Sequence, residues 1–245
     1  MPALLEVRNL TITFGGITAL SDVSFDVDEG RITGLIGPNG AGKTTCFNCI
    51  TRLYQPTGGT IAFKGDDLLR CPPQQIVRKR IARTFQNVAL FDHMTTLENV
   101  LVGGHGRFPG LSGWSSEQRA VGEASEILDR LGLASVARRP VRGLPFGTRK
   151  AVELARALMA KPELLLLDEP AAGLSHEEVA TLGATVKRVA SEFATTVLMV
   201  EHHMQLVMSV CDHIVVLASG RKLADGSPDT VRANPAVVEA YLGTV

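Results

Sequence analysis

The run Arg31-Ile-Thr-Gly-Leu-Ile36, followed directly by Gly37-Pro-Asn-Gly-Ala-Gly-Lys43-Thr44-Thr45, is the most informative part of the sequence. The first of these segments is short and apolar, which is typical of a buried strand, and it ends at a glycine-rich turn. Residues 44–53 then have the pattern of a helix. The segment from Gly37 matches G-x-x-x-x-G-K-[ST] in full and lies in the strand-to-helix context that this motif requires. These features predict a loop that binds a nucleoside triphosphate.

The chemistry of this loop assigns a part in binding to each of its residues. Glycines allow the backbone to curl so that successive N–H groups point at phosphate oxygens, and the N-terminus of the following helix adds a partial positive charge. Lys43 is expected to reach the β- and γ-phosphates, and the Thr44 hydroxyl is expected to bind Mg²⁺. The predicted nucleotide-binding residues are therefore Gly37, Pro38, Asn39, Gly40, Ala41, Gly42, Lys43, Thr44 and Thr45.

A second motif, Leu164-Leu-Leu-Leu-Asp168-Glu169-Pro170, is a buried strand with two carboxylates at its carboxyl end. Ligands of open α/β sheets bind at such strand ends. Asp168 is expected to contribute to the Mg²⁺ site, and Glu169 is expected to act as the general base that polarises the attacking water. The alternative is a surface turn with two solvated acids, and the glycine loop upstream argues against it.

The composition excludes several functional classes. The 245 residues include 25 Lys and Arg against 25 Asp and Glu, so there is no global positive field of the kind that favours nucleic-acid binding. The apolar runs are too short to span a bilayer, and the N-terminus lacks the pattern of a secretory signal, which predicts a cytoplasmic location. Four cysteines are too few for a disulfide framework, and Cys46 and Cys49 are expected to be small buried side chains.

Hydrophobic periodicity along the chain predicts an α/β fold. Residues 4–14 and 23–27 alternate apolar and polar side chains, which predicts an N-terminal antiparallel sheet. Further strands alternate with helices, which predicts a mostly parallel sheet covered on both faces. A segment rich in Gly, Pro and Ser and two helical segments suggest a helical insertion over about 88–160. The expected strands are 31–36, 164–167, 196–200 and 213–217, the expected helices 117–137, 149–160, 177–192 and 204–210, and the Gly-, Pro- and Ser-rich segment 105–116.

The two motifs together resemble the ATP-binding cassette (ABC) family of transporter ATPases. The resemblance implies a P-loop NTPase (RecA-like) core, with residues 1–245 forming a single nucleotide-binding domain that uses ATP and Mg²⁺. It also implies that Gln86, in Arg83-Thr-Phe-Gln86, contacts Mg²⁺ and the attacking water, that His202 contacts the γ-phosphate, and that Phe14 stacks on adenine. Outside this family pattern, a lone Gln, His or Phe is more often structural. His203 is expected to be a solvated neighbour.

Two segments depart from the family pattern. The family signature is commonly LSGGQ, whereas the matching stretch here is Leu144-Pro145-Phe146-Gly147-Thr148. Pro145 supplies neither a hydroxyl nor an N–H, whereas Gly147 keeps its amide. The resemblance implies that Leu144 and Gly147 contact ATP. Ser175 lies where the family usually has Asp. These changes suggest slower or differently coupled hydrolysis.

Several longer strings resemble the ATPase subunits of branched-chain amino acid importers, above all the tail Asn234-Pro235-Ala-Val-Val-Glu239-Ala-Tyr241-Leu-Gly243. The resemblance implies an ATP-hydrolysing importer subunit at the cytoplasmic face of the inner membrane. Its implied partners are a second cassette, identical or paralogous, the transmembrane permease subunits and, indirectly, a solute-binding protein. No nucleic-acid partner is expected.

Three alternatives remain open from the sequence. Importers of amides or urea carry similar cassettes, some cassettes act in translation or DNA repair, and the altered signature could mark a regulatory module with negligible turnover. A basic cluster (Arg138, Arg139, Arg142, Arg149 and Lys150) bears on the nucleic-acid alternative, although such a run is more often a solvated face. Leu90, Phe91 and Met94 are expected either to contact a permease helix or to fill the core of the insertion.

Overall fold

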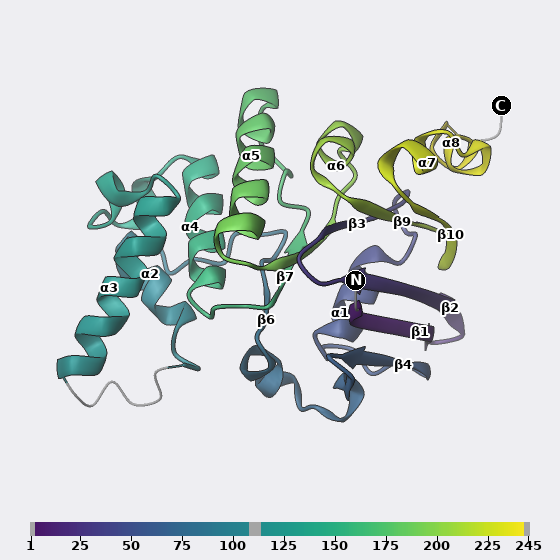
Figure 1. Cartoon of the computed structure of the whole chain (residues 1–245), viewed down its shortest axis with the longest axis horizontal. Helices are drawn as coiled ribbons and strands as arrows, with labels where there is room; N and C mark the ends of the chain where they lie inside the picture. The colour runs from purple at the N-terminus through teal and green to yellow at the C-terminus, as the bar shows by residue number, and fades with distance from the viewer. Residues whose placement is uncertain (1–2, 108–113, 243–245) are drawn as a thin grey trace.

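Two β-sheets of different kinds organise the chain in the computed structural model, which describes residues 3–107 and 114–242 (Figure 1). The first is a four-stranded antiparallel sheet with the strand order β2-β1-β4-β5. Its first two strands lie where alternation predicts them, and β2 is longer than expected because it begins well before residue 23. The bounds are β1 (Ala3–Phe14), β2 (Ile17–Asp28), β4 (Gly58–Phe63) and β5 (Asp66–Asp67).

The second sheet has six strands in the order β10-β9-β3-β8-β7-β6. Neighbouring strands from β6 to β9 pair in parallel, and only β10 pairs antiparallel, with β9. The carboxyl ends of the parallel strands therefore share one edge, where the glycine loop follows β3 and the two acids end β7. The bounds are β3 (Ile32–Ile36), β6 (Ile81–Arg83), β7 (Leu164–Asp168), β8 (Thr196–Val200), β9 (His213–Ala218) and β10 (Arg221–Gly226).

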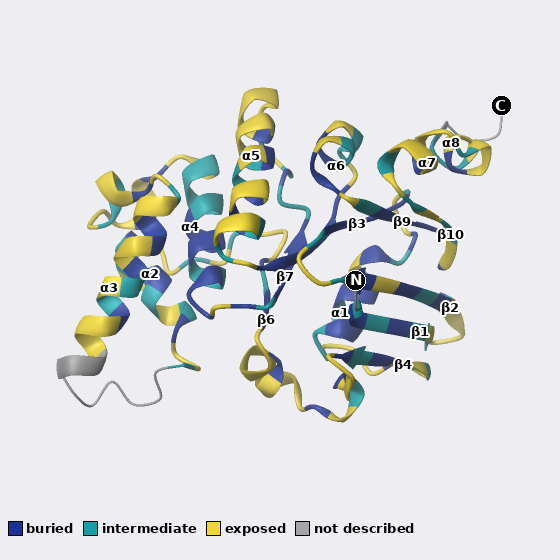
Figure 2. Ribbon diagram, in the orientation of Figure 1, coloured by how far each residue is buried: buried dark blue, intermediate teal, exposed yellow. Residues whose placement is uncertain are grey.

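Helices cover both faces of the six-stranded sheet, as Figures 1 and 2 show. One face packs on α1 and the antiparallel sheet, and the other packs on helices that include α5 and α6. The helical part between β6 and β7 consists of α2, α3 and α4. The bounds are α1 (Lys43–Ile50), α2 (Thr96–Gly103), α3 (Trp114–Arg130), α4 (Phe146–Leu158), α5 (His176–Glu192), α6 (Met204–Val210), α7 (Pro228–Arg232) and α8 (Pro235–Leu242).

Strand β7 divides the core into two parts. Leu164 and Leu166 belong to the cluster under α1 and the antiparallel sheet, whereas Leu165 and Leu167 belong to the cluster under the opposite helices. Successive side chains of a strand point to opposite faces, so an uninterrupted apolar run is required when both faces are buried. All five residues of β7 are buried, including Asp168. The α/β fold predicted from this run is confirmed.

Some predicted boundaries are wrong. The helix expected over 117–137 ends at Arg130, where Gly132 adopts a φ of 72° and a short 3-10 turn follows over Ala134–Val136. The helix expected over 44–53 ends at Ile50, and Arg52 has a φ of 63°. In both cases apolar periodicity continues past a residue whose backbone leaves the helix. Part of the segment 105–116, residues 108–113, lies outside the described residues.

The four cysteines are free and buried. Cys46 and Cys49 lie on the inner face of α1 with no exposed surface, and burial raises the pKa of the Cys49 thiol to about 11. Such thiols are poor nucleophiles and poor metal ligands. The prediction that they are small core side chains is therefore confirmed. Among the described helices, none is long and apolar enough to cross a membrane.

Phe47, on the same helix, should be critical for stability because its side chain is fully buried between α1 and the two sheets. We expect Phe47→Ala to lower the free energy of unfolding by about 3–5 kcal/mol in urea denaturation. Ile17→Ala is the matched control, because Ile17 is 75% exposed and its removal should change stability little. Equal stability of the two variants would contradict this account of the core.

Candidate nucleotide-binding and hydrolytic site

The loop between β3 and α1 can exist only with glycine at certain positions. Gly42, the N-cap of α1, has a φ of 98°, and a Cβ there would lie 2.8 Å from the carbonyl oxygen of Ala19 and 2.5 Å from the Leu20 side chain. A Cβ on Gly37 would lie 2.1 Å from the carbonyl oxygen of Leu217. The loop is thus pressed between β2 and the end of β9. No side chain caps α1, so the first amides of this helix are available to an anion.

Lys43 extends back into this loop. Its ammonium donates hydrogen bonds to the carbonyl oxygens of Gly37 (2.7 Å) and Pro38 (3.0 Å), and the residue is only 6% exposed. Burial lowers the pKa of Lys43, while the carboxylates of Glu169, Asp168 and Glu201 act in the opposite direction. The positive charge is therefore held inside the loop, in the field of the acids at the ends of β7 and β8. In the same loop, Asn39 and Gly40 are exposed, whereas Ala41 is buried.

The predicted metal-binding residues supply oxygen donors only. The Thr44 hydroxyl is on an exposed residue in the first turn of α1, and Asp168 closes β7. One carboxylate oxygen of Asp168, Oδ2, accepts a hydrogen bond from Arg83 at 2.6 Å, and Oδ1 has no such partner among the described residues. The Gln86 side chain has an amide oxygen as well as the NH₂ group that it uses toward Glu169. Hydroxyl, carboxylate and amide oxygens suit Mg²⁺, so this donor set fits the ion.

Three predicted catalytic residues lie together beside these donors. The Gln86 amide donates a hydrogen bond to Glu169 Oε2 at 2.7 Å, and His202 Nδ1 lies 3.8 Å from the same oxygen. Glu169 and Gln86 are 83 residues apart in the chain, and they meet because each follows the end of a parallel strand. The His202 side chain is 54% exposed and that of Glu169 is 17% exposed, so the carboxylate is shielded but reachable by water.

Arg83 is a site residue that the sequence analysis did not identify. Its guanidinium pairs with Asp168, donates from Nη1 to Asn48 Oδ1 (2.8 Å) and Thr51 Oγ1 (3.0 Å), and lies between the rings of Phe47 and Phe85. Both members of the ion pair are almost fully buried, at 7% and 4% side-chain exposure. The signal that could have found it is an arginine inside an otherwise apolar strand.

Phe14, the expected adenine contact, lies at the end of β1 and is 45% exposed. Its ring meets that of Tyr54 edge to face, with centroids 5.1 Å apart, and Tyr54 is 40% exposed. Phe14 pairs with Ile17 in the hairpin formed by β1 and β2. Ala19 and Leu20 of the same hairpin border the glycine loop. Tyr54 is therefore a second exposed aromatic group beside Phe14, and the sequence analysis missed it.

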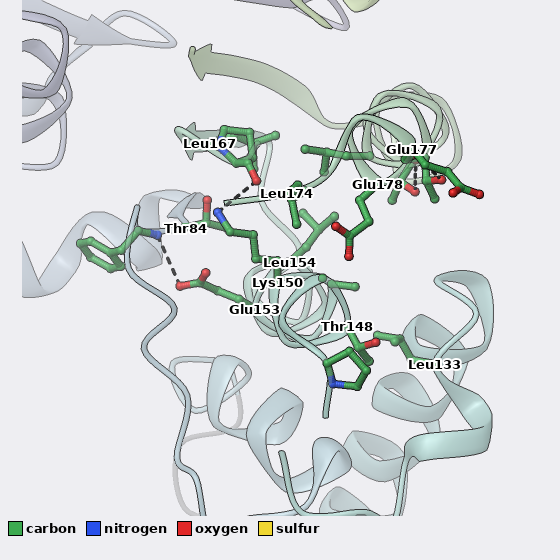
Figure 3. A pocket seen from close by; sticks show the side chains of 18 residues that line it. Thr84, Leu133, Thr148, Lys150, Glu153, Leu154, Leu167, Leu174, Glu177 and Glu178 are labelled. Atoms are coloured by element: carbon green, nitrogen blue, oxygen red, sulfur yellow. Dashed lines mark hydrogen bonds between the residues drawn. The ribbon is translucent and has the colours of Figure 1, made fainter. Parts of the chain in front are cut away.

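The signature segment forms the start of α4, away from the glycine loop. Pro145 is the N-cap and makes no side-chain cap, so the amides of Phe146 and Gly147 begin a helix with an open N-terminus. Leu144 is 6% exposed, and its side chain packs in the core of the helical part. A cavity of about 380 Å³ lies beside this turn, and none of the loop residues 37–45 lines it. Figure 3 shows its lining, which comes mostly from α4 and α5 and also includes Thr84, Phe85 and Pro170.

Ser175, which departs from the family pattern, and His203 both act as helix caps. Ser175 is the N-cap of α5, where its hydroxyl accepts a hydrogen bond from the Glu178 N–H while the Glu178 carboxylate accepts one from the Ser175 N–H. Such a capping box stabilises a helix start. His203 Nδ1 caps α6 by accepting from the Leu206 N–H at 3.4 Å. His203 is therefore more than the solvated neighbour expected from the sequence.

The loop after β3, the buried lysine and the two acids at the end of β7 define a nucleoside triphosphatase of the α/β class. Comparison with known protein families gives two matches. The family model described as ABC transporter matches residues 20–172, and the model described as Branched-chain amino acid ATP-binding cassette transporter matches residues 221–245. The chain belongs to the ABC transporter family, and it is an ATPase of the ATP-binding cassette type.

Individual relatives are similar over almost their whole length. The chain is 45% identical to the high-affinity branched-chain amino acid transport ATP-binding protein BraF of Pseudomonas aeruginosa, with 98% of both chains covered. It is 44% identical to the corresponding protein LivG of Escherichia coli K12, again over 98% of each. The crystal structure of MJ1267, an ATP-binding cassette of an ABC transporter in its ADP conformation, is 32% identical and covers 100% of both chains with a TM-score of 0.88.

Removing Arg83 should destabilise the protein by leaving the Asp168 carboxylate buried without its partner. We expect Arg83→Met to lower the free energy of unfolding in the absence of nucleotide by about 3–5 kcal/mol, measured by denaturant titration. The double variant Arg83→Met/Asp168→Asn removes the unpaired charge and should recover part of this loss. An unchanged unfolding midpoint for the single variant would contradict a structural role for this pair.

Proposed function

We propose that this chain is the ATP-hydrolysing subunit of a branched-chain amino acid importer and that Glu169 is its general base. The observation that carries this assignment is the group of Gln86, His202 and Glu169 at the edge where Lys43 and Asp168 also lie. BraF and LivG, which this chain resembles from end to end, are named as branched-chain amino acid transport ATP-binding proteins. The match of residues 221–245 to the branched-chain family supports the same substrate class.

In the proposed reaction, the amides of the glycine loop and the Lys43 ammonium bind the β- and γ-phosphates. Glu169 accepts a proton from the attacking water, which Gln86 helps to orient through its hydrogen bond to the same carboxylate. His202, whose Nδ1 lies 3.8 Å from Glu169 Oε2, offsets charge on the γ-phosphate. Mg²⁺, held by Thr44, Asp168 and Gln86, supplies electrostatic stabilisation of the phosphate oxygens when bound.

A second cassette is part of this proposal. Gly147 lies in the first turn of α4, which has no side-chain cap, but this turn belongs to the helical part and lies apart from the glycine loop. A head-to-tail pair of cassettes, identical or paralogous, would bring each signature segment to the other's nucleotide. A similar protein of 25% identity, MJ0796, is described as a dimeric bacterial ABC transporter cassette, with a TM-score of 0.80 over 91% of this chain and 98% of that one.

Glu169→Gln tests the role of the carboxylate. The variant keeps the size of the side chain and can still meet Gln86, but it cannot accept a proton from water. We expect ATP binding to persist, turnover to fall by at least ~10²-fold, and the dimer to be favoured in the presence of ATP. ATPase rate, nucleotide affinity and sedimentation measure these three properties. Undiminished turnover would refute the assignment of Glu169.

The permease-binding surface is proposed to include the segment after Gln86. Phe91 is 51% exposed and Met94 is 38% exposed, whereas Leu90 is partly buried against the core of the helical part. Leu90 therefore fits the core of the insertion, whereas Phe91 and Met94 are free to contact a permease helix. Exposed apolar side chains of this kind suit contact with a helix of a membrane subunit. We accordingly propose that the cassette lies at the cytoplasmic face of the membrane and binds permease subunits. A solute-binding protein would deliver the solute to these permease subunits.

Phe91→Ser should separate hydrolysis from transport. Phe91 is exposed and is not part of the catalytic group, so the basal ATPase rate of the purified chain should be unchanged. Uptake of labelled leucine into vesicles that contain the complete transporter should be abolished. Val238→Ser is a control for the loss of an exposed apolar side chain, because Val238 is 44% exposed and lies in α8. Normal uptake with Phe91→Ser would remove this surface from the proposal.

A nucleic-acid-associated or purely regulatory cassette is less well supported. In the basic cluster, Arg149 pairs with Asp92 at 2.8 Å, and the Lys150 ammonium is bound to two backbone carbonyl oxygens. Both charges are thus used within the protein. Uptake assays with amides or urea beside leucine test the other importers, and stimulation of ATPase activity by the permease tests the regulatory reading.

A further inference from the structure

The backbone that carries Glu169 is strained. Glu169 has a φ of 45°, in the left-handed region that non-glycine residues seldom adopt. The residue after it, Pro170, has no N–H and cannot donate a backbone hydrogen bond. Such a conformation persists only when the surrounding structure holds it, and it is often found at functional sites. We call residues 169–171 the Glu169 turn.

Glu201 holds this turn from one side. Its side chain is fully buried, and Oε1 accepts a hydrogen bond from the Ala171 N–H at 2.7 Å. The other oxygen, Oε2, accepts from the N–H groups of His202 (3.0 Å) and His203 (3.1 Å). One carboxylate therefore joins the turn that carries Glu169 to the segment that carries His202.

Lys150 holds the turn from the other side. Its ammonium donates to the carbonyl oxygens of Pro170 (3.1 Å) and Glu169 (3.3 Å), and Figure 3 shows the side chain reaching from α4 toward the end of β7. The same ammonium lies 5.4 Å from the centre of the Phe146 ring. Burial lowers the pKa of Lys150, and the negative charges of Glu153, Glu201 and Glu169 oppose this effect.

The two contacts are complementary. Lys150 occupies the carbonyl oxygens of the turn and Glu201 occupies its amide, so the peptide groups on both sides of Pro170 are fixed. The two side chains come from different parts of the chain, because Lys150 belongs to the signature helix and Glu201 follows β8. Lys150 therefore connects α4 directly to the backbone carbonyl oxygens of Glu169 and Pro170.

We propose that Lys150 and Glu201 are positioning residues that clamp the Glu169 turn, so that the Glu169 carboxylate stays in contact with Gln86 and His202, and that Lys150 links the signature helix to this carboxylate. This inference rests on the proposed function, because it takes Glu169 to be the general base. Neither residue touches the reacting atoms in this arrangement.

Substitutions in the full-length chain test the clamp. Lys150→Met removes the ammonium that donates to the carbonyl oxygens of Glu169 and Pro170. Glu201→Gln replaces one carboxylate oxygen with an NH₂ group, which cannot accept a hydrogen bond from a backbone N–H, and makes the other oxygen a weaker acceptor. A misplacement of about 1 Å at a reacting group can lower a rate by ~10²-fold, so we expect each variant to lose about 10- to 100-fold in kcat with KM for ATP unchanged. Lys150→Arg keeps a donor and should recover most of the rate.

Matched controls separate positioning from loss of stability. Lys187→Met and Glu192→Gln alter exposed residues of α5 and should leave kcat and Tm unchanged. Thermal unfolding of each variant reports on folding, and Lys150→Met is the informative variant if Glu201→Gln fails to fold, because the lysine is only partly buried.

A double-variant comparison gives the decisive result. If Lys150 acts through Glu169, Lys150→Met should cause no further loss of the residual rate in a Glu169→Gln background. A wild-type kcat for Lys150→Met, an equal loss in both backgrounds, or an effect on KM alone would each overturn the clamp. Normal turnover of Glu169→Gln by itself would instead overturn the proposed function, so the two failures are distinguishable.

Discussion

Parallel pairing of the six-stranded sheet is the constraint on which the site depends. Because β3, β7 and β8 run in the same direction and in register, the segments that follow them emerge at one edge. The glycine loop, Glu169 and His202 are brought together in this way from widely separated parts of the chain. The apolar residues of these strands are buried on both faces, so the stability of the core and the geometry of the site have the same origin.

The charges at this edge are balanced by direct contacts rather than by solvent. Lys43 binds carbonyl oxygens of its own loop, Arg83 binds Asp168, and Lys150 binds carbonyl oxygens of the Glu169 turn. Glu201 accepts three backbone N–H groups. A buried charge is costly unless it is paired and hydrogen-bonded, so these contacts fix the backbone as well as the side chains. Each of them can also transmit a displacement of one segment to another.

The departures from the family pattern have local physical explanations. Ser175 lacks a carboxylate but completes a capping box that starts α5, and His203 caps α6. Phe146, in the variant signature, packs against Gly173, where a Cβ would lie 3.0 Å from the ring. Glu178 approaches Gly147 so closely that a Cβ would lie 2.6 Å from its Oε1. The signature turn and the segment after Glu169 are therefore packed directly on one another.

The sequence alone was sufficient to predict the glycine loop, the acid-ended strand β7 and the α/β class, because each depends on residues that are adjacent in the chain. It also predicted most strands from apolar periodicity, but it placed helix ends too late where Arg52 and Gly132 turn the backbone. The contacts of Arg83, Lys150 and Glu201 are visible only in the tertiary structure. Arg83 and Asp168 are 85 residues apart, and Glu201 and Ala171 are 30 apart, so no local pattern marks them as partners. Their contacts exist because parallel strands bring distant segments to one edge, where buried polar groups must find partners.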